Sequence, residues 1–540
     1  MPLDLLGDPW IPVRRLSGAR DLIAPHEITA RYAEDPIVAI AAPRPDFDGA
    51  LHEFLIGLLA TCFRPVDEDD WFDRLDAPPG PDELREAFSA VGEAFRLDGD
   101  RAFMQEFGGL EGDAVPIGAL LIDAPGENTI RRNTDLFIRR GNVTCLCPAC
   151  AAQALYTLQA FSPAGGAGHR TSLRGGGPLT TLVQVPARVG DDGMATAWTR
   201  LWPNVPDALR RNGPLPADRA RVFPWLAPTR VSDKGGKATT PADADGLQVF
   251  WGMPRRIRLL FESADGRRCS LCGSAAELVA AAYRTRPHGT NYQGDWRHPL
   301  TPYILRKGDT ALPRHPNPGG FGYRHWLGLV QADGNGRIPA ECVATFRDRR
   351  QQIMPDRPAR LIAFGYDMDN MKARCWYAGE MPLVSLPDPE IVPEFEAEAR
   401  MLVRAADHVA RLVTWAVKSA LFDKPSDASG DFDRIAERFW LETEPAFWAT
   451  LDEIRLALGS GADRGPVRKR WLGQLSQAAF AVFDDEAPSE ALEEGGFRRI
   501  VEARRGLALG LRGRGKVGQG LFGALLLPVP EKARKTEDVA

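Results

Sequence analysis

Apolar residues near the start of the chain recur at helical spacing. Between residues 47 and 59 they fall at every third or fourth position behind the polar start formed by Asp46 and Asp48, which predicts a helix. Residues 82–95 repeat this pattern and predict a second helix. Ahead of both, the short apolar run 8–13 carries prolines at its margins, which is typical of an edge strand.

Runs of β-branched and aromatic residues in the middle of the chain predict strands. The first three runs are residues 179–185, 247–251 and 257–261. Two further runs, 361–366 and 373–377, flank residues 367–370 and predict a β-hairpin closed by Asp and Asn turn residues. Residues 190–245 show no clear periodicity and predict a long, partly irregular excursion.

The chain changes character at residues 382–393, which hold four prolines. Beyond them, four helical patterns joined by short Gly, Pro and Asp loops predict an up-and-down bundle. These patterns cover residues 394–421, 432–458, 467–483 and 489–509. The expected fold is therefore α+β, with a large irregular mixed domain at 1–385 followed by a C-terminal four-helix bundle at 386–540.

Length and composition describe an ordinary globular protein with several domains. The 540 residues exceed the roughly 250–300 that one core usually serves. The net charge of -5 excludes a uniformly basic coat for nucleic acid, so any such contact must come from local basic clusters. No secretory signal or membrane span is expected, and eight cysteines, four of them in Cys-x-x-Cys pairs, favour the cytoplasm.

The densest candidate chemistry lies between residues 131 and 178. Two arginine pairs, at 131–132 and 139–140, bracket an apolar segment that contains Phe137. A Cys-x-x-Cys pair, a helical segment, a glycine turn and a basic glycine-rich block then follow. Cations, apolar residues and bare glycine backbone together predict a surface that grips a polyanion.

Two Cys-x-x-Cys pairs have the geometry of zinc knuckles. They are Cys147 with Cys150 and Cys269 with Cys272. Each pair places two thiolates on one tight turn and supplies half of a tetrahedral site, so the two together predict one structural zinc ion. A set of buried free thiols, or a site in which Cys145 replaces one ligand, is the alternative. A redox role is not favoured, because no βαβ pattern surrounds either pair.

Glycines flank two arginines just after the first knuckle. The glycines are Gly165, Gly166, Gly168 and Gly175 to Gly177, and the arginines are Arg170 and Arg174. Glycine lets backbone amides approach a groove or phosphate without an intervening Cβ, and arginine forks onto phosphate oxygens. Two tight turns whose arginines pair with surface carboxylates would explain the same residues.

A basic stripe runs along the first predicted bundle helix. It consists of Arg400, Arg404, Arg411 and Lys418, on a face separate from the apolar one. A solvated helix face explains this pattern, and the alternative is a stripe that follows a phosphate backbone.

Other motifs are weak. The G-x-G-x-x-G run at 513–518 follows a predicted helix, with no βαβ unit, so it is a poor dinucleotide fingerprint. Asp367 and Asp369 have the chemistry of divalent-metal ligands, yet a turn-capping role is favoured because no further carboxylates cluster beside them. No hydrolytic histidine motif and no serine or cysteine nucleophile motif is present in the sequence.

Together these blocks resemble the large subunit (CasA) of the type I-E CRISPR surveillance complex, Cascade. The cysteine knuckle with the Leu-Arg-Gly-Gly-Gly-Pro block is the most specific part of the resemblance. The similar blocks are residues 8–13, 147–160, 172–183, 269–273 and 298–302, together with the C-terminal helices.

The resemblance implies a non-catalytic subunit in antiviral defence. Such a subunit reads the protospacer-adjacent motif of duplex DNA mainly from the minor groove, helps start unwinding, and recruits a separate helicase-nuclease. Its implied partners are the other Cascade subunits, the guide RNA, the duplex target and the displaced single strand. Glycine backbone in a shallow groove agrees with tolerant selection, and an apolar wedge agrees with opening a base step.

The resemblance also implies particular DNA contacts. A loop before the first knuckle would supply Phe137 and Arg139, and the turn after it would supply Gly165 and Gly166. Arg284 or Arg286 would be the basic residue that follows the second knuckle. The expected DNA-binding set adds neighbouring residues and three arginines of the bundle stripe, namely Arg140, Gly168, Arg170, Arg174, Arg400, Arg404 and Arg411. A member of the family has Phe-x-Asn in this loop, where this chain has Arg139, and an asparagine and an arginine present different donors to the minor groove.

Two other functional classes compete with this interpretation. One is a zinc-containing nuclease or transferase that uses the knuckles with Asp367 and Asp369. The other is a structural scaffold without DNA contact, in which substitution of Phe137 or Gly166 would leave binding unchanged.

Overall fold

The computed structural model forms two compact units. The first unit holds residues 1–320 and 334–384, and the second holds 321–333 and 385–540. The described residues are 3–135, 138–166, 168–188, 194–207, 215–233, 236–354, 356–386, 388–487 and 494–529. The sequence patterns did not predict that segment 321–333 joins the helical unit, because it lies well ahead of the proline-rich boundary.

Helix α1 (Pro45–Cys62) is the central element of the first unit. It begins at a proline whose fixed backbone suits the first helical position, and Asp46 and Asp48 lie in its first turn. Nearly every side chain of the helix is buried, and the Phe54 ring meets the rings of five other aromatic residues edge to face. The helix predicted at 47–59 is confirmed.

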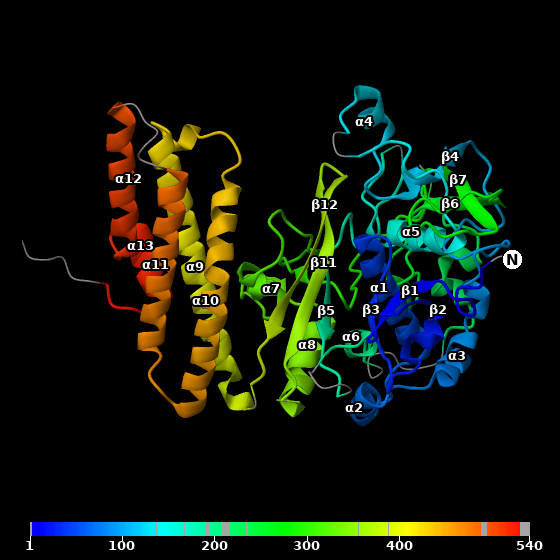
Figure 1. Cartoon of the computed structure of the whole chain (residues 1–540), viewed down its shortest axis with the longest axis horizontal. Coiled ribbons are helices and arrows are strands. Elements are labelled where there is room, and N and C mark those ends of the chain that lie inside the picture. The colour runs from blue at the N-terminus through cyan, green and yellow to red at the C-terminus, as the bar shows by residue number, and fades with distance from the viewer. Residues whose placement is uncertain are drawn as a thin grey trace, which may run out of the picture. The chain divides into compact units, whose positions relative to one another are not determined.

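Strands of the described first unit form four small sheets (Figure 1). One sheet has the order β2-β1-β3, with β1 at Ile11–Arg15, β2 at Arg20–Ile23 and β3 at Ile37–Ile40. A second has the order β4-β7-β6, with β4 at Ala114–Pro116, β7 at Leu278–Arg286 and β6 at Arg256–Ser263. A third has the order β12-β11-β5, with β12 at Lys372–Leu383, β11 at Ala359–Asp369 and β5 at Thr180–Gln184. The fourth has the order β10-β8-β9, with β10 at Arg337–Ile338, β8 at Tyr303–Ile304 and β9 at Leu312–Pro313.

Strand β1 corrects the prediction of an edge strand, because it lies between β2 and β3. The proline is tolerated because β3 pairs with β1 only from Val13 onward, so Pro12 needs no N–H on that side. The strand predicted at 247–251 is also wrong. Residues 246–249 form a short 3-10 helix, because the Asp245 carboxylate accepts the N–H of Leu247 and starts the turn.

The β-hairpin of β11 and β12 is confirmed. Its strands pair antiparallel from Ala359 with Leu383 to Asp369 with Lys372. Asn370 and Met371 close the turn with φ values of 48° and 64°, the left-handed conformation that two-residue hairpin turns require. The excursion after β5 contains α6 (Ala197–Leu201) and short 3-10 turns, which confirms its partly irregular character.

Shorter helices lie outside the bundle. In the first unit they are α2 (Glu68–Asp76), α3 (Pro81–Ser89), α4 (Glu127–Arg132), α5 (Pro148–Phe161) and α8 (Glu341–Thr345), while α7 (Trp326–Leu329) is part of the second unit. The helix predicted at 82–95 ends early, at Ser89 in α3, and a short 3-10 turn follows at residues 92–94.

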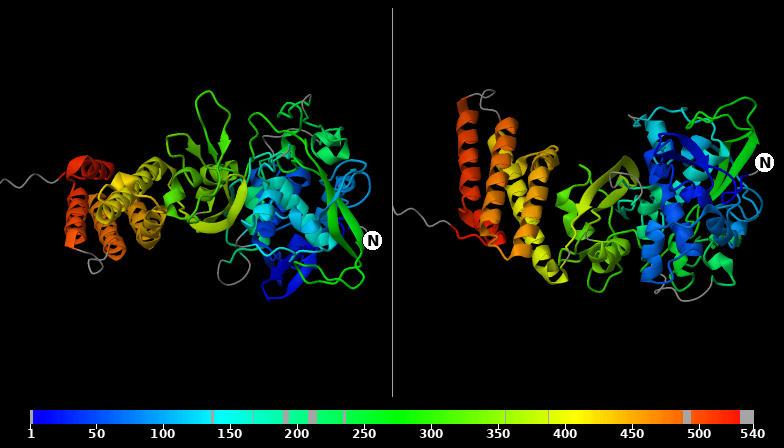
Figure 2. Two further views of the ribbon diagram at one scale, coloured as in Figure 1. Left: turned by 90° about the horizontal axis from the view of Figure 1, so that it is seen from above. Right: turned by 60° about the horizontal axis from the view of Figure 1, so that its bottom comes forward.

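The second unit is a bundle of long helices that lie side by side (Figures 1 and 2). They are α9 (Val392–Leu421), α10 (Asp433–Ser460), α11 (Gly465–Glu486) and α12 (Glu494–Leu511). The predicted bundle is confirmed, and α9 packs against the other three. Buried Glu398 of α9 pairs with Arg464 and Arg468, which ties α9 to the start of α11.

A further helix, α13 (Gly515–Ala524), was not predicted. The glycines of the G-x-G-x-x-G run allow it to pack against the end of α12. A Cβ at Gly518 would lie 2.5 Å from the carbonyl oxygen of Gly510. These glycines therefore serve close helix packing and not a phosphate loop.

Candidate functional site

Four cysteines meet at the start of α5. The Sγ atoms of Cys147, Cys150, Cys269 and Cys272 all lie within 4.8 Å of one another. The Sγ atoms of Cys147 and Cys272 are 3.7 Å apart. The edge of a tetrahedron with zinc–sulfur bonds of about 2.3 Å is about 3.8 Å, so the spacing suits a zinc ion. The fold thus brings both predicted knuckles to one place.

Backbone contacts hold the two knuckles together. Leu146 and Ala280 exchange two backbone hydrogen bonds of 2.9 and 2.8 Å, which join the segment before α5 to β7. The N–H of Ser270 donates to the carbonyl oxygen of Cys145, at 2.9 Å. Gly273 has a φ of 72°, the left-handed conformation that the second knuckle needs in order to turn.

Cys145 is not one of the four. Its thiol donates to the carbonyl oxygen of Arg268 at 3.2 Å, and its side chain packs with Ala264 and Val279. The alternative in which Cys145 replaces a ligand is therefore wrong in this structure.

The proximity of the four thiols changes their acidity. A hydrogen bond from the Cys150 thiol lowers the pKa of Cys272 to about 6. Hydrogen bonding to the Cys147 sulfur raises the pKa of Cys150. Hydrogen bonds among the four sulfurs thus favour the thiol form at Cys150 and the thiolate form at Cys272. A bound zinc ion would instead hold all four as thiolates. The donor set and its spacing fit a structural zinc ion.

Helix α5 and strand β7 both lead from the knuckle to the glycine turn at residues 163–169. Cys147 is the N-cap of α5, and the 14 residues of the helix span about 21 Å. Ala280 in β7 pairs with the knuckle, and His288, just past the end of β7, donates its N–H to the carbonyl oxygen of Gly168 at 2.8 Å. Two rigid elements therefore set the distance between the metal-type site and the turn.

The glycine turn presents bare backbone to solvent. Gly165 and Gly166 are exposed, and nothing lies within 4 Å of a Cβ built on Gly166. Gly166 and Gly168 have φ values of 67° and 84°. The N–H of Gly165 donates to the carbonyl oxygen of His169 at 3.1 Å, and the N–H of His169 donates to that of Gly166 at 2.8 Å. A tightly closed turn thus offers main-chain groups without side-chain cover.

Two residues that the sequence analysis missed line this turn. Arg255 donates to the carbonyl oxygen of Pro163, and a Cβ at Gly168 would lie 2.7 Å from the His288 ring. Burial, Arg255 and His288 lower the pKa of His169. Neither residue lies in a motif, so only the fold reveals their proximity.

Arg174 does not belong to a DNA-binding surface, which corrects the prediction. The residue is 4% exposed, and its guanidinium pairs with buried Glu53 at 2.5 Å. It also donates to the hydroxyls of Thr180 and Thr301 at 3.1 and 3.0 Å. A buried arginine with these partners cannot reach a phosphate, and its role is to link α1 to β5.

Arg170 is partly buried and bonded to Ser232. Its Nε donates to the hydroxyl at 2.8 Å and its Nη2 to the carbonyl oxygen at 2.7 Å. These bonds fix the segment after the glycine turn against residue 232.

Arg284 and Arg286 lie on β7 at the end nearer the glycine turn. Arg286 is exposed and donates through Nε to the Glu111 carbonyl oxygen at 2.7 Å. Arg284 is partly buried, with a longer bond of 3.4 Å to the Leu110 carbonyl oxygen. Neither is paired with a carboxylate in the described structure.

The loop before the first knuckle is only partly described, and Phe137 lies outside the described residues. Arg139 is exposed and makes no hydrogen bond or ion pair with another described residue. Arg140 instead pairs with Asp135 through Nε and Nη2, each at 2.5 Å. The hydrogen bonds from Arg140 lower the pKa of the Asp135 carboxyl and link these two residues of the loop. Arg139 is therefore the more available of the two cations.

The stripe on α9 is engaged within its own unit. Arg400 and Arg404 donate to the carbonyl oxygens of Ala332 and Asp333 at 3.4 and 3.3 Å. Arg411 pairs with Asp407 one turn earlier, and its side chain is largely exposed. Arg400 and Arg404 thus bind the end of segment 321–333 through hydrogen bonds.

The aspartates of the β11–β12 hairpin are not arranged as metal ligands. Both carboxylate oxygens of Asp367 accept from Arg374, at 2.8 and 2.9 Å. In the described chain, the four cysteines form the one group with metal-ligand spacing. The predicted turn-capping role is also corrected, because Asp367 pairs across the hairpin and Asn370 occupies the turn.

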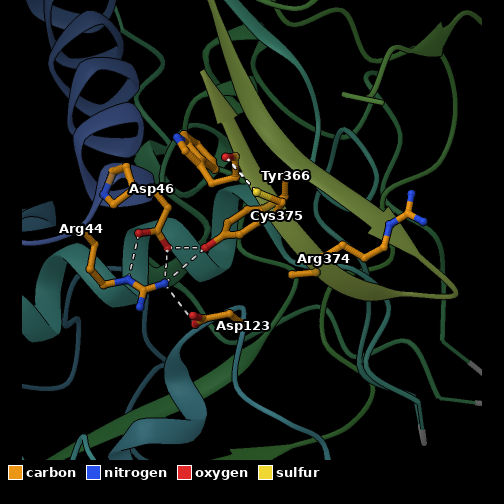
Figure 3. Close-up of a pocket in the computed structure, with 9 residues that line it drawn as sticks. Arg44, Asp46, Asp123, Tyr366, Arg374 and Cys375 are labelled. Carbon is orange, nitrogen blue, oxygen red and sulfur yellow. Dashed lines mark hydrogen bonds and ion pairs between the residues drawn. The ribbon is translucent and has the colours of Figure 1, made fainter. Parts of the chain in front are cut away.

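A cavity of about 270 Å³ lies beside this hairpin (Figure 3). Arg44 binds Asp46 through two bonds of 2.9 and 3.0 Å and Asp123 at 3.0 Å, while Tyr366 donates to Asp46 at 2.6 Å. Figure 3 shows Arg374 pointing away from this cluster. Burial raises the pKa of Tyr366, so the hydroxyl is a neutral donor. The polar groups satisfy one another and join α1 to the hairpin.

No helix of the described chain is both long enough and apolar enough to cross a bilayer.

Fold and site define a protein with an α+β unit that contains a four-cysteine knuckle and with a second, helical unit. A family model described as CRISPR-associated protein Cse1 matches residues 4–482. The chain belongs to this family. The family membership expected from the sequence blocks is confirmed.

Solved structures share the fold over nearly the whole chain. Cse1 from Acidimicrobium ferrooxidans matches with a TM-score of 0.66 and 18% identity, covering 98% of this chain and 99% of that one. CasA from Thermus thermophilus matches with a TM-score of 0.65 and 18% identity, covering 94% and 99%. A chain of a structure titled "CRISPR RNA-guided surveillance complex" matches with a TM-score of 0.65 and 17% identity, covering 94% and 99%.

Proposed function

We propose that this chain is the large subunit of a type I-E CRISPR RNA-guided surveillance complex. In that role it reads the protospacer-adjacent motif of duplex DNA, promotes unwinding of the target and recruits a helicase-nuclease. Membership of the Cse1 family supports the assignment, as does the likeness to a chain of a surveillance complex. Its partners are the other subunits and the guide RNA, and it performs no catalysis itself.

The observation that carries the proposal is the exposed glycine turn, held at a fixed distance from a buried knuckle. Gly165 and Gly166 have no side chain to keep backbone groups out of a shallow groove. The minor groove carries a degenerate pattern of donors and acceptors, and main-chain groups suit such tolerant reading. A structural zinc ion at the knuckle keeps this turn in place.

Neighbouring residues take complementary roles. Arg139 approaches the groove from the loop before the knuckle, and Arg286 contributes positive charge from β7. On the helical unit, exposed Arg411 contacts phosphates of the displaced strand without reading sequence.

A substitution at Gly166 tests the proposal. The variant Gly166→Asp adds bulk and negative charge where nothing else lies within 4 Å, so it should abolish motif-dependent binding while the fold is kept. The measurement is a gel shift of the assembled complex with motif-bearing and motif-lacking duplexes, alongside thermal melting.

The matched control is Gly18→Asp, in the turn between β1 and β2. Gly18 also has a positive φ, of 87°, and nothing within 4 Å of its Cβ position, so the backbone strain is comparable. Motif-dependent binding should survive at Gly18. Unchanged binding by Gly166→Asp would refute the assignment of the turn.

A further inference from the structure

Arg255 reaches the glycine turn from the residue just before β6. Its Nη2 donates to the carbonyl oxygen of Pro163 and its Nε to the hydroxyl of Ser162, at 3.4 Å for the latter. Its backbone N–H donates to Gln159 at 3.0 Å. A Cβ at Gly165 would lie 2.5 Å from Nη1 of Arg255, so the absence of a side chain at Gly165 leaves room for this guanidinium.

Arg255 lacks a carboxylate partner in the described structure, unlike three other arginines of the first unit that are at least partly buried. Arg44 pairs with Asp46, Arg174 with Glu53 and Arg256 with Glu106. The ionisable side chains that face Arg255 are His169, on the turn, and Tyr283, on β7. No hydrogen bond joins its Nη1 to another described residue.

Removing a cation partly from water costs free energy unless a nearby anion compensates its charge. Burial lowers the pKa of Arg255 to about 10, consistent with a charge that lacks a close counter-ion. Gly165 and Gly166 are exposed and carry no side chain, so these two residues place no side chain between Nη1 and an anionic group that approaches from solvent.

We propose that Nη1 of Arg255 binds a phosphodiester group of the duplex DNA that the glycine turn reads. This inference rests on the proposed function and adds to it a phosphate-binding residue outside every motif. Contacts to phosphate position a protein on the duplex without specifying sequence, so Arg255 sets the depth and register at which Gly165 and Gly166 approach the groove. Nε and Nη2 hold the turn while Nη1 holds the phosphate.

The salt dependence of DNA binding by the assembled complex tests this proposal. Arg255→Gln should weaken binding of motif-bearing and motif-lacking duplexes by the same factor. It should also reduce the slope of log affinity against log salt by about 0.9, the value for one lost phosphate contact. Arg255→Lys keeps the charge but loses the fork to Pro163 and Ser162, so its slope should stay at the wild-type value.

The matched control is Arg101→Gln, which removes one positive charge from an exposed pair with Glu93 in the same unit. Its salt slope should equal that of the wild type. Equal loss of slope in Arg255→Gln and Arg255→Lys would overturn the proposal, because the residue would then act only by positioning the turn.

Two further outcomes separate this inference from the proposed function. If Gly166→Asp abolishes motif-dependent binding while Arg255→Gln leaves the slope unchanged, the phosphate contact is refuted and the motif-reading role stands. If Arg255→Gln lowers the amount of guide RNA in the purified complex without changing the slope for DNA, the phosphate belongs to RNA and the proposal is wrong. Insensitivity of binding to Gly166→Asp would refute the proposed function itself.

Discussion

The two ends of α5 and β7 contrast in how their polar groups are satisfied. At the knuckle end, three of the four thiols are buried, and backbone bonds join Leu146 to Ala280. At the glycine-turn end, Gly165 and Gly166 are exposed and Arg255 has no carboxylate partner in the described chain. At the first end the protein supplies the polar partners itself, whereas at the second end a cation and exposed main-chain groups have no described carboxylate or side-chain cover.

In the proposed role, α5 and β7 serve two purposes. Under the proposed function, the buried end contributes folding free energy and the exposed end contributes binding to DNA. Substitutions at the knuckle should therefore change stability first, and substitutions at the turn should change DNA affinity first. Three predictions test this separation.

The largest effect is expected at the knuckle. Cys269→Ser removes one of the four cysteines that would bind zinc. Zinc binding at structural sites of this type contributes on the order of 10 kcal/mol to folding. Zinc should therefore be lost, and the first unit should melt at a lower temperature. Metal analysis and thermal melting measure both. Cys145→Ser is the control, because Cys145 is buried nearby but bonds to Arg268 and should leave the zinc content unchanged.

An intermediate loss of stability is expected at Arg174, the residue of the glycine-rich block that lies in the core. Arg174→Ala leaves the buried Glu53 carboxylate without its cationic partner and should lower the free energy of unfolding by about 3–5 kcal/mol. Chemical denaturation measures this loss. The salt slope for DNA should not change if the complex is assembled under conditions where the variant is folded. A lower slope with unchanged stability would contradict the assignment of Arg174 to the core.

The smallest effect on stability is expected at Arg139. Arg139→Asn should leave the melting temperature unchanged, because the side chain is exposed and has no described partner. It should alter the ranking of motif variants, since an amide and a guanidinium offer different donors to the minor groove. A panel of duplexes measures the ranking. Arg132→Asn, an exposed arginine near the same loop, should leave it unaltered, and identical rankings for both variants would count against the loop assignment.

Much of the fold follows from local patterns. The apolar spacing after Asp46 predicts α1, and the last proline of residues 382–393 lies in the first turn of α9. Where the local pattern predicted the wrong structure, a nearby side chain or a strand from a distant segment determined the actual one. The run at 247–251 turns because Asp245 caps it, and β1 is central because β3 pairs with it from a later segment.

The sequence by itself determined the chemistry of the four cysteines and their grouping in pairs, because that information lies within four residues. Only the tertiary structure determined which arginines have a carboxylate partner and which do not. Arg174 is neutralised by Glu53, 121 residues away, and Arg255 meets the glycine turn from 92 residues beyond Pro163. Exposure and counter-charge are properties of the space around a side chain, and segments far apart in the chain fill that space.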